Sequence, residues 1–423
     1  MSCLRRVGPT LVLLLAGLSA RADNWPQWRG PTLDGVSKET GLPARWTATE
    51  NVVWKLKLPG VGGSTPVVWD DRVLLTSEDG DAIVLLCVGT DGKVKWKKAF
   101  GKATPHARTD EGNGASATPS TDGKHVWAFA GSGELACFDL DGKEVWMFNL
   151  QDRYGRFDNQ YGIHSTPVLH KDRLYLQLIH DGAAVVVALE KGTGKEVWKV
   201  ERKSDGVAEN KHSYASPSLW QKGDDAYLIT HGNDYTIGHR LEDGKEIWRV
   251  TELNPKAKYN PTLRFVATPV ATPELIVVPS AKNGAVVAVK PDAAGTVSPG
   301  SKGELWRKTS GTPDVPCPLV HDGLVYICRE NQGILTVLDA KTGQQVYSER
   351  IYADRYRASP VYADGKIYLS SRKGVVTVVK AGRTFEKLAE NRLPDQMSAS
   401  PAVANGRIYL RGFETLYCIG AAK

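Results

Sequence analysis

Basic and imidazole side chains stand in the polar segments that separate the short apolar runs of this sequence. Imidazoles can bind metals or transfer protons, and guanidinium groups bind carboxylates and other anions, often through two parallel hydrogen bonds. The arginines therefore favour a surface for an anionic or peptide-carboxylate ligand. The candidate ligand-binding residues are His164, His180, His212, His231, Arg264, Lys282, Arg329, Glu330, Arg357, Arg372 and Arg411.

No motif typical of a catalytic or metal centre accompanies these residues. The sequence has no His-Glu-x-x-His, no Gly-x-Ser-x-Gly, no phosphate-binding glycine loop and no EF-hand spacing. The four histidines fall in separate segments, and nothing in their spacing brings them within the roughly 2 Å of one ion that a metal site needs. We therefore predict no catalytic residues and no metal site.

The cysteines give a second chemical signal. Cys87, Cys137 and Cys418 fall at one equivalent position of a repeat described below, which indicates small buried core residues. Cys317 and Cys328 flank a turn symmetrically, which would place them opposite each other in a hairpin. An oxidising compartment would allow a disulfide between these two, and a pair of free thiols is the alternative.

A Ser/Thr/Ala-x-Pro or Ser-Pro element recurs along the chain at intervals of 41 to 53 residues. Each copy continues with an apolar stretch, a turn rich in Asp, Asn and Gly, a β-branched strand, a polar loop and a third apolar strand. This period is typical of four-stranded propeller blades. The prolines are Pro66, Pro119, Pro167, Pro217, Pro269, Pro318, Pro360 and Pro401.

The last strand of most copies follows a glycine turn and carries a large aromatic residue. A glycine leaves space where a ring from a neighbouring blade can lie flat, so we expect each ring to dock between blades. The docking residues are Trp54, Trp96, Trp146, Trp198, Trp248, Trp306 and Tyr347.

The eighth copy ends at Lys423 without an outer strand. A matching strand lies near the other end of the chain, around Trp54, and its addition to the last blade would close the ring and cover two sheet edges. We therefore expect an all-β, eight-bladed propeller of four-stranded blades, closed by this N-terminal strand. Residues 23–423 form one domain in this interpretation, and 23–50 act as an N-terminal clasp.

The repeated Asp-x-x-(Thr)-Gly-Lys-x-x-Trp pattern, in which the Thr is optional, resembles the tryptophan-docking repeat of the pyrroloquinoline-quinone (PQQ)-like, quinoprotein alcohol dehydrogenase-like propellers. For enzymes of this family the resemblance implies PQQ held with calcium beside two adjacent cysteines. This sequence has no Cys-Cys pair, and Glu330 and Asn331 are the nearest matches to the acid and amide on calcium. The chain is more similar to non-catalytic periplasmic members, such as the scaffold propeller of β-barrel assembly.

The first 22 residues have the features of a signal peptide. Arg5 and Arg6 precede a short apolar run at 11–18, and Ala20-Arg21-Ala22 supplies a small-x-small cleavage pattern. We expect cleavage after Ala22 and a periplasmic or secreted protein. An uncleaved anchor is the alternative, although the apolar run is much shorter than the roughly 20 residues needed to span a bilayer.

The charge of the chain excludes some function classes. The formal charge is +7, and loss of the three arginines in 1–22 would leave +4 (7 − 3). No Lys/Arg block is present, so a nucleic-acid partner is not expected. Long polar loops are predicted to surround the central funnel on one face. These loops cover residues 100–116, 151–165, 201–215 and 251–267.

Together these features predict an exported, monomeric and non-catalytic propeller without a cofactor. It would act as a binding or scaffold protein for a protein or peptide partner in the cell envelope. The alternative is a PQQ-type quinoprotein oxidoreductase, or another cofactor-dependent enzyme, with its site in the funnel.

Overall fold

A computed structural model describes residues 23–105, 113–159, 161–281 and 284–421. The predicted signal peptide (1–22) and the candidate residue Lys282 lie outside these ranges. In the part of the chain that is described, no helix has the length and apolar character needed to cross a bilayer.

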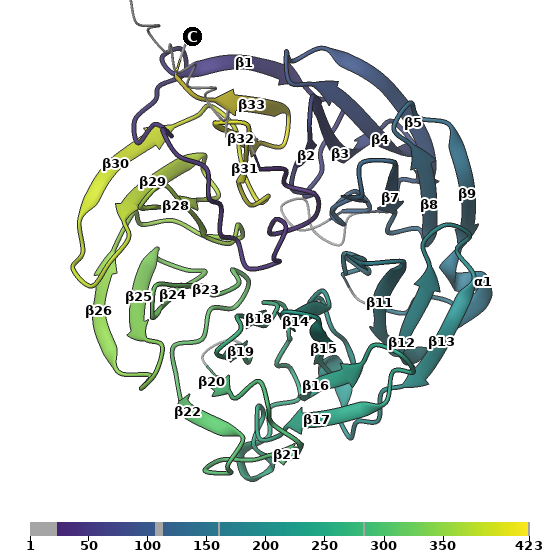
Figure 1. Ribbon diagram of the computed structural model, residues 1–423, viewed down its shortest axis with the longest axis vertical. Coiled ribbons are helices and arrows are strands. Elements are labelled where there is room, and N and C mark those ends of the chain that lie inside the picture. The colour runs from purple at the N-terminus through teal and green to yellow at the C-terminus, as the bar shows by residue number, and fades with distance from the viewer. Residues whose placement is uncertain (1–22, 106–112, 160, 282–283, 422–423) are drawn as a thin grey trace, which may run out of the picture.

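Eight sheets, antiparallel except for one added strand in blade 4, surround a central axis like the blades of a propeller (Figure 1). This arrangement confirms the fold predicted from the repeat. Blade 1 contains β2 (Val67–Trp69), β3 (Arg72–Asp79), β4 (Ala82–Gly89) and β5 (Val94–Lys102). Blade 2 contains β6 (Ser120–Thr121), β7 (His125–Phe129), β8 (Glu134–Asp139) and β9 (Glu144–Asn149). Blade 3 contains β10 (Val168–His170), β11 (Arg173–His180), β12 (Ala183–Glu190) and β13 (Glu196–Glu201). Blade 4 contains β14 (Ser218–Lys222), β15 (Asp225–Gly232), β16 (Tyr235–Arg240), β17 (Glu246–Val250) and β21 (Gly295–Val297).

The second half of the ring repeats this order, with the innermost strand first in each blade. Blade 5 contains β18 (Val270–Ala271), β19 (Ile276–Pro279), β20 (Val286–Val289) and β22 (Glu304–Lys308). Blade 6 contains β23 (Leu319–His321), β24 (Leu324–Cys328), β25 (Ile334–Asp339) and β26 (Gln345–Arg350). Blade 7 contains β27 (Val361–Ala363), β28 (Lys366–Ser370), β29 (Val375–Lys380) and β30 (Lys387–Arg392). Blade 8 contains β31 (Ala402–Ala404), β32 (Arg407–Arg411), β33 (Thr415–Ile419) and β1 (Val52–Lys57). Short helices are α1 (Leu150–Tyr154), η1 (Ala208–Lys211) and η2 (Lys256–Lys258).

The core lies between the blades because each sheet buries both of its faces. Successive side chains of a strand point to opposite faces of its sheet, so neighbouring residues belong to different apolar clusters. In β3, Leu74 packs with Cys87 in one cluster, whereas Leu75 packs with Leu86 in the next. This explains why the inner strands are continuous apolar runs instead of alternating apolar and polar residues.

The ring is closed by the N-terminal strand, as predicted. β1 pairs antiparallel with β33, which places Trp54 opposite Cys418 and Lys55 opposite Tyr417. The last blade is thus built from both ends of the described chain (Figure 1). This pairing covers edges of β1 and β33 that would otherwise be open to other strands.

Five tryptophans dock on a glycine of the next blade. The indole of Trp96, for example, lies over Gly142, and its Nε1 donates to the Leu140 carbonyl at 2.9 Å. Trp54, Trp146, Trp198 and Trp306 make the equivalent contacts with Gly92, Gly194, Gly244 and Gly343.

Trp248 departs from this pattern. Its ring packs on Gly238 of its own blade and lies edge-on to Tyr227. The reason is the fifth strand of blade 4, β21, which pairs in parallel with β17 and covers the outer edge that carries Trp248. None of the described glycines lies against the ring of Tyr347, which packs against Phe385 instead.

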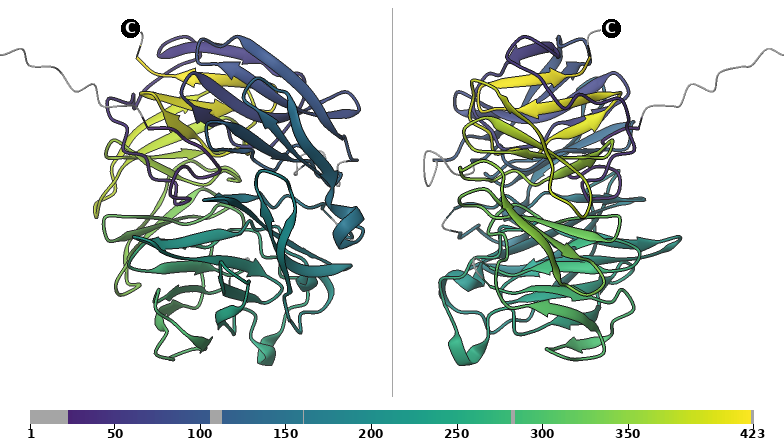
Figure 2. Two further views of the ribbon diagram at one scale, coloured as in Figure 1. Left: turned by 45° about the vertical axis from the view of Figure 1, so that its right-hand side comes forward. Right: turned by 90° about the vertical axis from the view of Figure 1, so that its left-hand side faces the viewer.

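The segment 23–50 crosses the face of the ring that is turned toward the viewer in Figure 1, and Figure 2 shows it from the side against that face. It touches distant blades in turn. Trp25 bridges Val68 of blade 1, and Arg29 Nη2 donates to the Pro318 carbonyl of blade 6 at 2.9 Å. The Trp46 amide donates to Asn391 in blade 7 at 3.0 Å. These contacts link the clasp segment to blades 1, 6 and 7.

Candidate functional site

A narrow cavity follows the propeller axis and is lined by the segments that lead into the innermost strands. Each of the eight segments contributes the residue directly before its repeat proline and the residue three positions before that proline. The cavity has two adjoining parts of about 200 and 170 Å³. The lower ring is Thr65, Thr118, Thr166, Ser216, Thr268, Cys317, Ser359 and Ser400. The upper ring is Gly63, Ser116, His164, Tyr214, Val266, Val315, Arg357 and Ser398.

Hydrogen bonds connect the lower ring from blade to blade. The Thr65 amide donates to Thr118 Oγ1 at 3.0 Å, and the Thr118 amide donates to Thr166 Oγ1 at 3.1 Å. The pattern continues to Ser400, with Cys317 Sγ accepting from the Thr268 amide at 3.2 Å. Seven such bonds give buried amides an acceptor at the point where the blades meet. This explains the small hydroxyl residue before the proline.

The upper part of the cavity holds the charged groups. Arg357 lies 3.2 Å from Glu330, and Arg264 lies 3.6 Å from Glu209. Burial acts to raise the pKa of Glu330, but a hydrogen bond with Asp314 and the guanidinium groups of Arg357 and Arg355 outweigh it and lower the pKa. Glu330 is therefore ionised at neutral pH, and the site contains paired cations and anions instead of an isolated positive patch.

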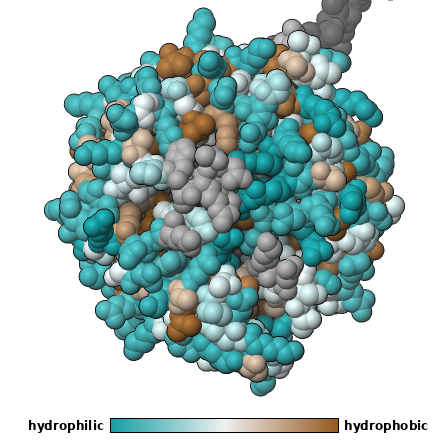
Figure 3. Space-filling view, turned by 180° about the vertical axis from the view of Figure 1, so that it is seen from behind, coloured by the Kyte–Doolittle hydropathy of each residue, from teal (hydrophilic) through white to brown (hydrophobic). Residues whose placement is uncertain are grey.

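The opposite end of the axis is occupied by the clasp. Trp28 lines the lower part of the cavity, and the adjacent Arg29 is 1% exposed. Arg29 Nη2 donates to backbone carbonyls of Asp34 and Pro318, whereas Nε and Nη1 have no hydrogen-bond partner. The upper ring and its arginines face the loop side of the ring, which is largely hydrophilic in Figure 3.

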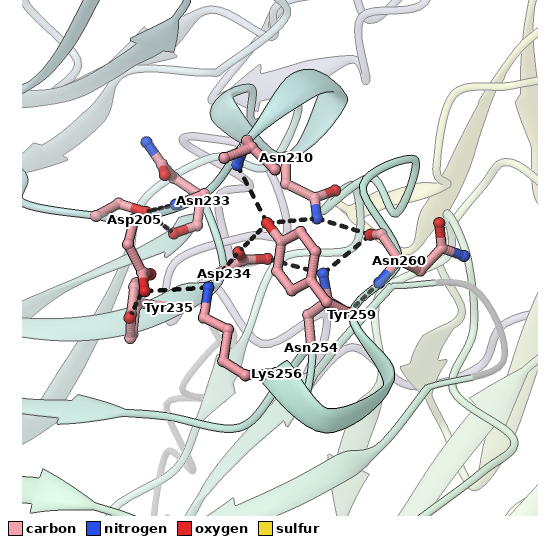
Figure 4. A network of polar contacts seen from close by, with 12 residues as sticks. Asp205, Asn210, Asn233, Asp234, Tyr235, Asn254, Lys256, Tyr259 and Asn260 are labelled. Atoms are coloured by element: carbon pink, nitrogen blue, oxygen red, sulfur yellow. Dashed lines mark hydrogen bonds and ion pairs between the residues drawn. The ribbon is translucent and has the colours of Figure 1, made fainter.

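A polar network holds two of the long loops in place (Figure 4). Tyr259 Oη accepts from the Val207 amide and from Asn210 Nδ2, both at 3.1 Å, and donates to Asp234 Oδ2 at 2.5 Å. Asn254 and Lys256 complete the surroundings of Asp234. Burial raises the pKa of this carboxyl, which is 4% exposed. The network joins 201–215 to 251–267 and so positions Tyr214 and Arg264.

The predicted ligand-binding residues divide into those at the axis and those elsewhere. His164, Arg264 and Arg357 line the cavity, and Glu330 lies behind Arg357. His180 and His212 form a separate buried group beside Asp181, with His212 Nε2 3.2 Å from Asp181 Oδ2. Burial lowers the pKa of His180, whose Nδ1 accepts from two amides.

The other candidates belong to the core or to other surfaces. His231 is fully buried, with its pKa lowered to about 3 by burial, and lies edge-on to Phe265. Arg411 is 1% exposed and binds Ser64 Oγ at 2.6 Å, tying blade 8 to blade 1. Arg372 covers the Phe413 ring in a groove of blades 7 and 8. Arg329 is half-buried and does not line either part of the axial cavity.

Of the two alternatives for Cys317 and Cys328, the structure has the free thiols and not the disulfide. Cys317 and Cys328 are both free and buried. Cys317 precedes β23 and packs between blades 5 and 6, whereas Cys328 packs in the cluster between blades 6 and 7. Pro318 ends the alternation before the strand begins, so the hairpin symmetry does not place both thiols on one face.

Sequence reasoning missed most of the cavity lining, including Ser116, Tyr214 and Ser398. The signal was present in the repeat, because these residues all stand three positions before a repeat proline. Among the described residues, no group of three or more His, Cys, Asp or Glu side chains is placed to hold a metal ion.

Comparisons with known proteins agree with this architecture. The model of the family described as outer membrane protein assembly factor BamB matches residues 36–175, 131–297 and 241–423. These overlapping matches cover nearly all of the described chain. A search of the curated proteins finds no match.

Solved structures share the fold at low sequence identity. BamB from Moraxella catarrhalis is 12% identical, with a TM-score of 0.62 over 87% of this chain and 99% of that one. Quinohemoprotein alcohol dehydrogenase from Comamonas testosteroni is 14% identical, with a TM-score of 0.68 over 96% of this chain and 82% of that one. The computationally designed Ika8 protein is 12% identical, with a TM-score of 0.57 over 86% of this chain and 98% of that one.

Proposed function

Since this chain belongs to the PQQ-like β-propeller family that includes the outer membrane protein assembly factor BamB, we propose that it is an exported, non-catalytic binding or scaffold protein. Its loop face would hold a protein or peptide partner in the cell envelope. The family supports a protein partner, and the sequence features of 1–22 support export.

The axial cavity is the observation that carries this proposal. Its loop side presents Arg264, Arg357 and Tyr214, which are suited to an extended polypeptide and to its carboxylate groups. The Tyr214 hydroxyl is buried without a hydrogen-bond partner, so a ligand that supplies an acceptor would relieve a cost of about 1–3 kcal/mol. The network around Asp234 holds the loops before a ligand binds, which lowers the entropic cost of binding.

The alternative, a calcium-held PQQ site, does not fit the residues at the axis. Glu330 and Asp314 interact with the arginines that line the cavity, and a guanidinium beside a carboxylate opposes the binding of a cation there. The thiols of Cys317 and Cys328 are not adjacent and lie in different core clusters. These features favour a binding protein over a quinoprotein oxidoreductase.

Partner capture tests the proposal. Purified protein would be crosslinked in an envelope extract, and captured proteins would be identified for the wild type and Arg357→Ala. Arg383→Ala is a matched control because Arg383 is 63% exposed and pairs with Asp339 away from the axis. We expect one reproducible partner that Arg357→Ala loses and Arg383→Ala keeps. Equal capture by both variants would remove the axial arginines from the proposal.

A cofactor titration tests the alternative directly. The protein would be titrated with PQQ and Ca²⁺ while the quinone absorbance is followed, and dye reduction would be assayed with alcohols and sugars. We expect no stoichiometric complex. A tight complex with turnover would replace the binding function with the enzymatic one.

A further inference from the structure

The lower ring of the cavity has more hydrogen-bond donors than the protein uses. A serine or threonine hydroxyl can donate one hydrogen and accept two. Six ring hydroxyls accept the amide of the preceding blade. No described residue accepts a hydrogen bond from any of them, and each ring residue is at most 5% exposed. Buried donors of this kind require an acceptor. The six are those of Thr118, Thr166, Ser216, Thr268, Ser359 and Ser400.

The charges around the ring favour an anionic acceptor. Neither ring contains an acidic residue, whereas Arg357 belongs to the upper ring. Beneath the lower ring, the buried Arg29 guanidinium contacts the Pro318 carbonyl next to Cys317 and keeps two nitrogens unpartnered. A shaft lined by hydroxyl donors, with the Arg357 guanidinium in its upper ring and the Arg29 guanidinium near Cys317 of the lower ring, stabilises negative charge.

We propose that this shaft binds the carboxylate at the end of an extended polypeptide, so that the partner is recognised by its free C-terminus. The inference rests on the proposed function and specifies which part of the partner enters the cavity. The carboxylate lies at the level of the lower ring and accepts from its hydroxyls, and Arg357 contacts it from above. The two parts of the cavity, about 200 and 170 Å³, have room for a terminal residue and no folded segment.

The upper ring also provides an apolar side for the last side chain. Val266 and Val315 stand on adjacent blades, opposite the polar side that carries Ser116 and Ser398. A chain end with a small apolar last residue therefore fits better than a second charged group.

The test compares matched probes by calorimetry at constant ionic strength. Acetyl-Ala-Val with a free carboxylate is the first probe, its C-terminal amide is the second, and inorganic phosphate is the third. We expect the free acid to bind and the amide to bind at least about tenfold more weakly, because hydrogen bonds to a charged group are lost. Equal binding of acid and amide, or no binding of either, would overturn the proposal and leave a water-filled shaft. Binding of phosphate in preference to the peptide acid would overturn the chain-end assignment.

A tethered carboxylate gives a second test with the full chain. Val266→Glu places an acid in the upper ring, and Val266→Gln is its uncharged control. We expect Val266→Glu to weaken binding of the peptide acid at least about tenfold relative to Val266→Gln, because the tethered group competes for the same donors. If both variants bind the probe equally, the proposal fails. Failure of partner capture with intact probe binding would remove the proposed function and leave the carboxylate site in place.

Discussion

The indole of Trp54, from the first strand of the chain, lies over Gly92 in the last turn of blade 1. A β-carbon on Gly92 would lie 2.8 Å from the ring, and Trp54 Nε1 donates to the Thr90 carbonyl at 2.8 Å. Because β1 also pairs with β33, this one contact joins the closing strand to the next blade. The Trp54 ring can lie this close to blade 1 only because Gly92 has no β-carbon.

Replacement of this glycine should weaken closure. Gly92 has φ +83°, so Gly92→Ala adds backbone strain of about 1 kcal/mol and a contact with Trp54 that costs about 1–3 kcal/mol more. Gly365→Ala is the control, since Gly365 has φ +70° and no atom within 4 Å of its added β-carbon. The free energy of unfolding, measured in urea, should fall further for Gly92→Ala. Equal losses would show that the Trp54 contact does not contribute to stability.

Much of the fold could be predicted from the sequence because each blade repeats the same physical requirements. Docking rings need a glycine opposite them, and the missing outer strand of blade 8 has its match at Trp54. β21 could not be predicted, because three residues within a longer loop carry no strand signal of their own. Its pairing with β17 changes the packing of Trp248.

The candidate site was harder to predict from residue type. Arg264 and Arg357 reach the axis, whereas Arg411 and His231 look similar in the sequence and are buried in the core. The difference lies in their repeat position. Arg357 stands before a repeat proline, and Arg411 ends a middle strand, where its side chain binds Ser64 of the next blade. Position relative to the proline is thus a better guide than charge.

The outer edge of strand β9 should be the edge through which the protein associates most readily with other chains. Of the six tryptophan-bearing outer strands, five place a basic residue directly after the tryptophan, and such residues protect edges from pairing with other chains. β9 has Met147 there, 42% exposed, beside Val145 at 45%. We expect Met147→Lys to raise the solubility limit in ammonium sulfate and leave the melting temperature within about 2 °C. The basic residues are Lys55, Lys97, Lys199, Arg249 and Arg307.

The reciprocal variant provides the control for this prediction. Lys199→Met places an apolar residue at the same position of β13, next to the exposed Val197. It should lower the solubility limit. If neither variant changes solubility, the outer edges do not govern self-association.

His231 should make the protein sensitive to moderate acid. Its pKa is lowered from 6.5 to about 3 by burial, so the native state resists protonation. The stability contributed by the neutral form is complete above pH 6.5 and is lost as the pH falls toward 3, at about 1.4 kcal/mol per pH unit. We expect His231→Gln to flatten the dependence of the unfolding free energy on pH between 6 and 4. His125→Gln, at a partly exposed position, is the control, and parallel curves for all three proteins would contradict the prediction.

The ionised form of Glu330 should stabilise the folded protein, because the pKa of this carboxyl is lowered in the folded state. Its pKa is lowered below 4.5, so its contribution is present above that pH and is lost as the pH falls through the lowered value. We expect Glu330→Gln to cost about 1–3 kcal/mol at pH 7, since the ion pairs of Arg355 and Arg357 with this carboxylate are lost. The difference from wild type in urea denaturation should shrink below pH 4.5. A difference that is constant with pH would indicate a loss of packing alone.

The hydroxyl of Tyr259 should control the order of the two long loops without controlling the fold. It accepts from Val207 and Asn210 and donates to Asp234, so Tyr259→Phe removes two hydrogen bonds between 201–215 and 251–267 and a third that fixes the ring to Asp234. Hydrogen exchange in both loops should become faster, because local opening no longer breaks these bonds, while the sheets keep their protection.

Binding of a peptide acid at the axis should weaken together with the loops in Tyr259→Phe, because Tyr214 and Arg264 would no longer be held before binding. Tyr352→Phe is the matched control, since its hydroxyl contacts Arg392 on an exposed edge. If exchange increases in the loops but the affinity for the peptide acid stays at the wild-type value, the loops do not preorganise the cavity. The arginines and hydroxyl ring would then be sufficient for binding.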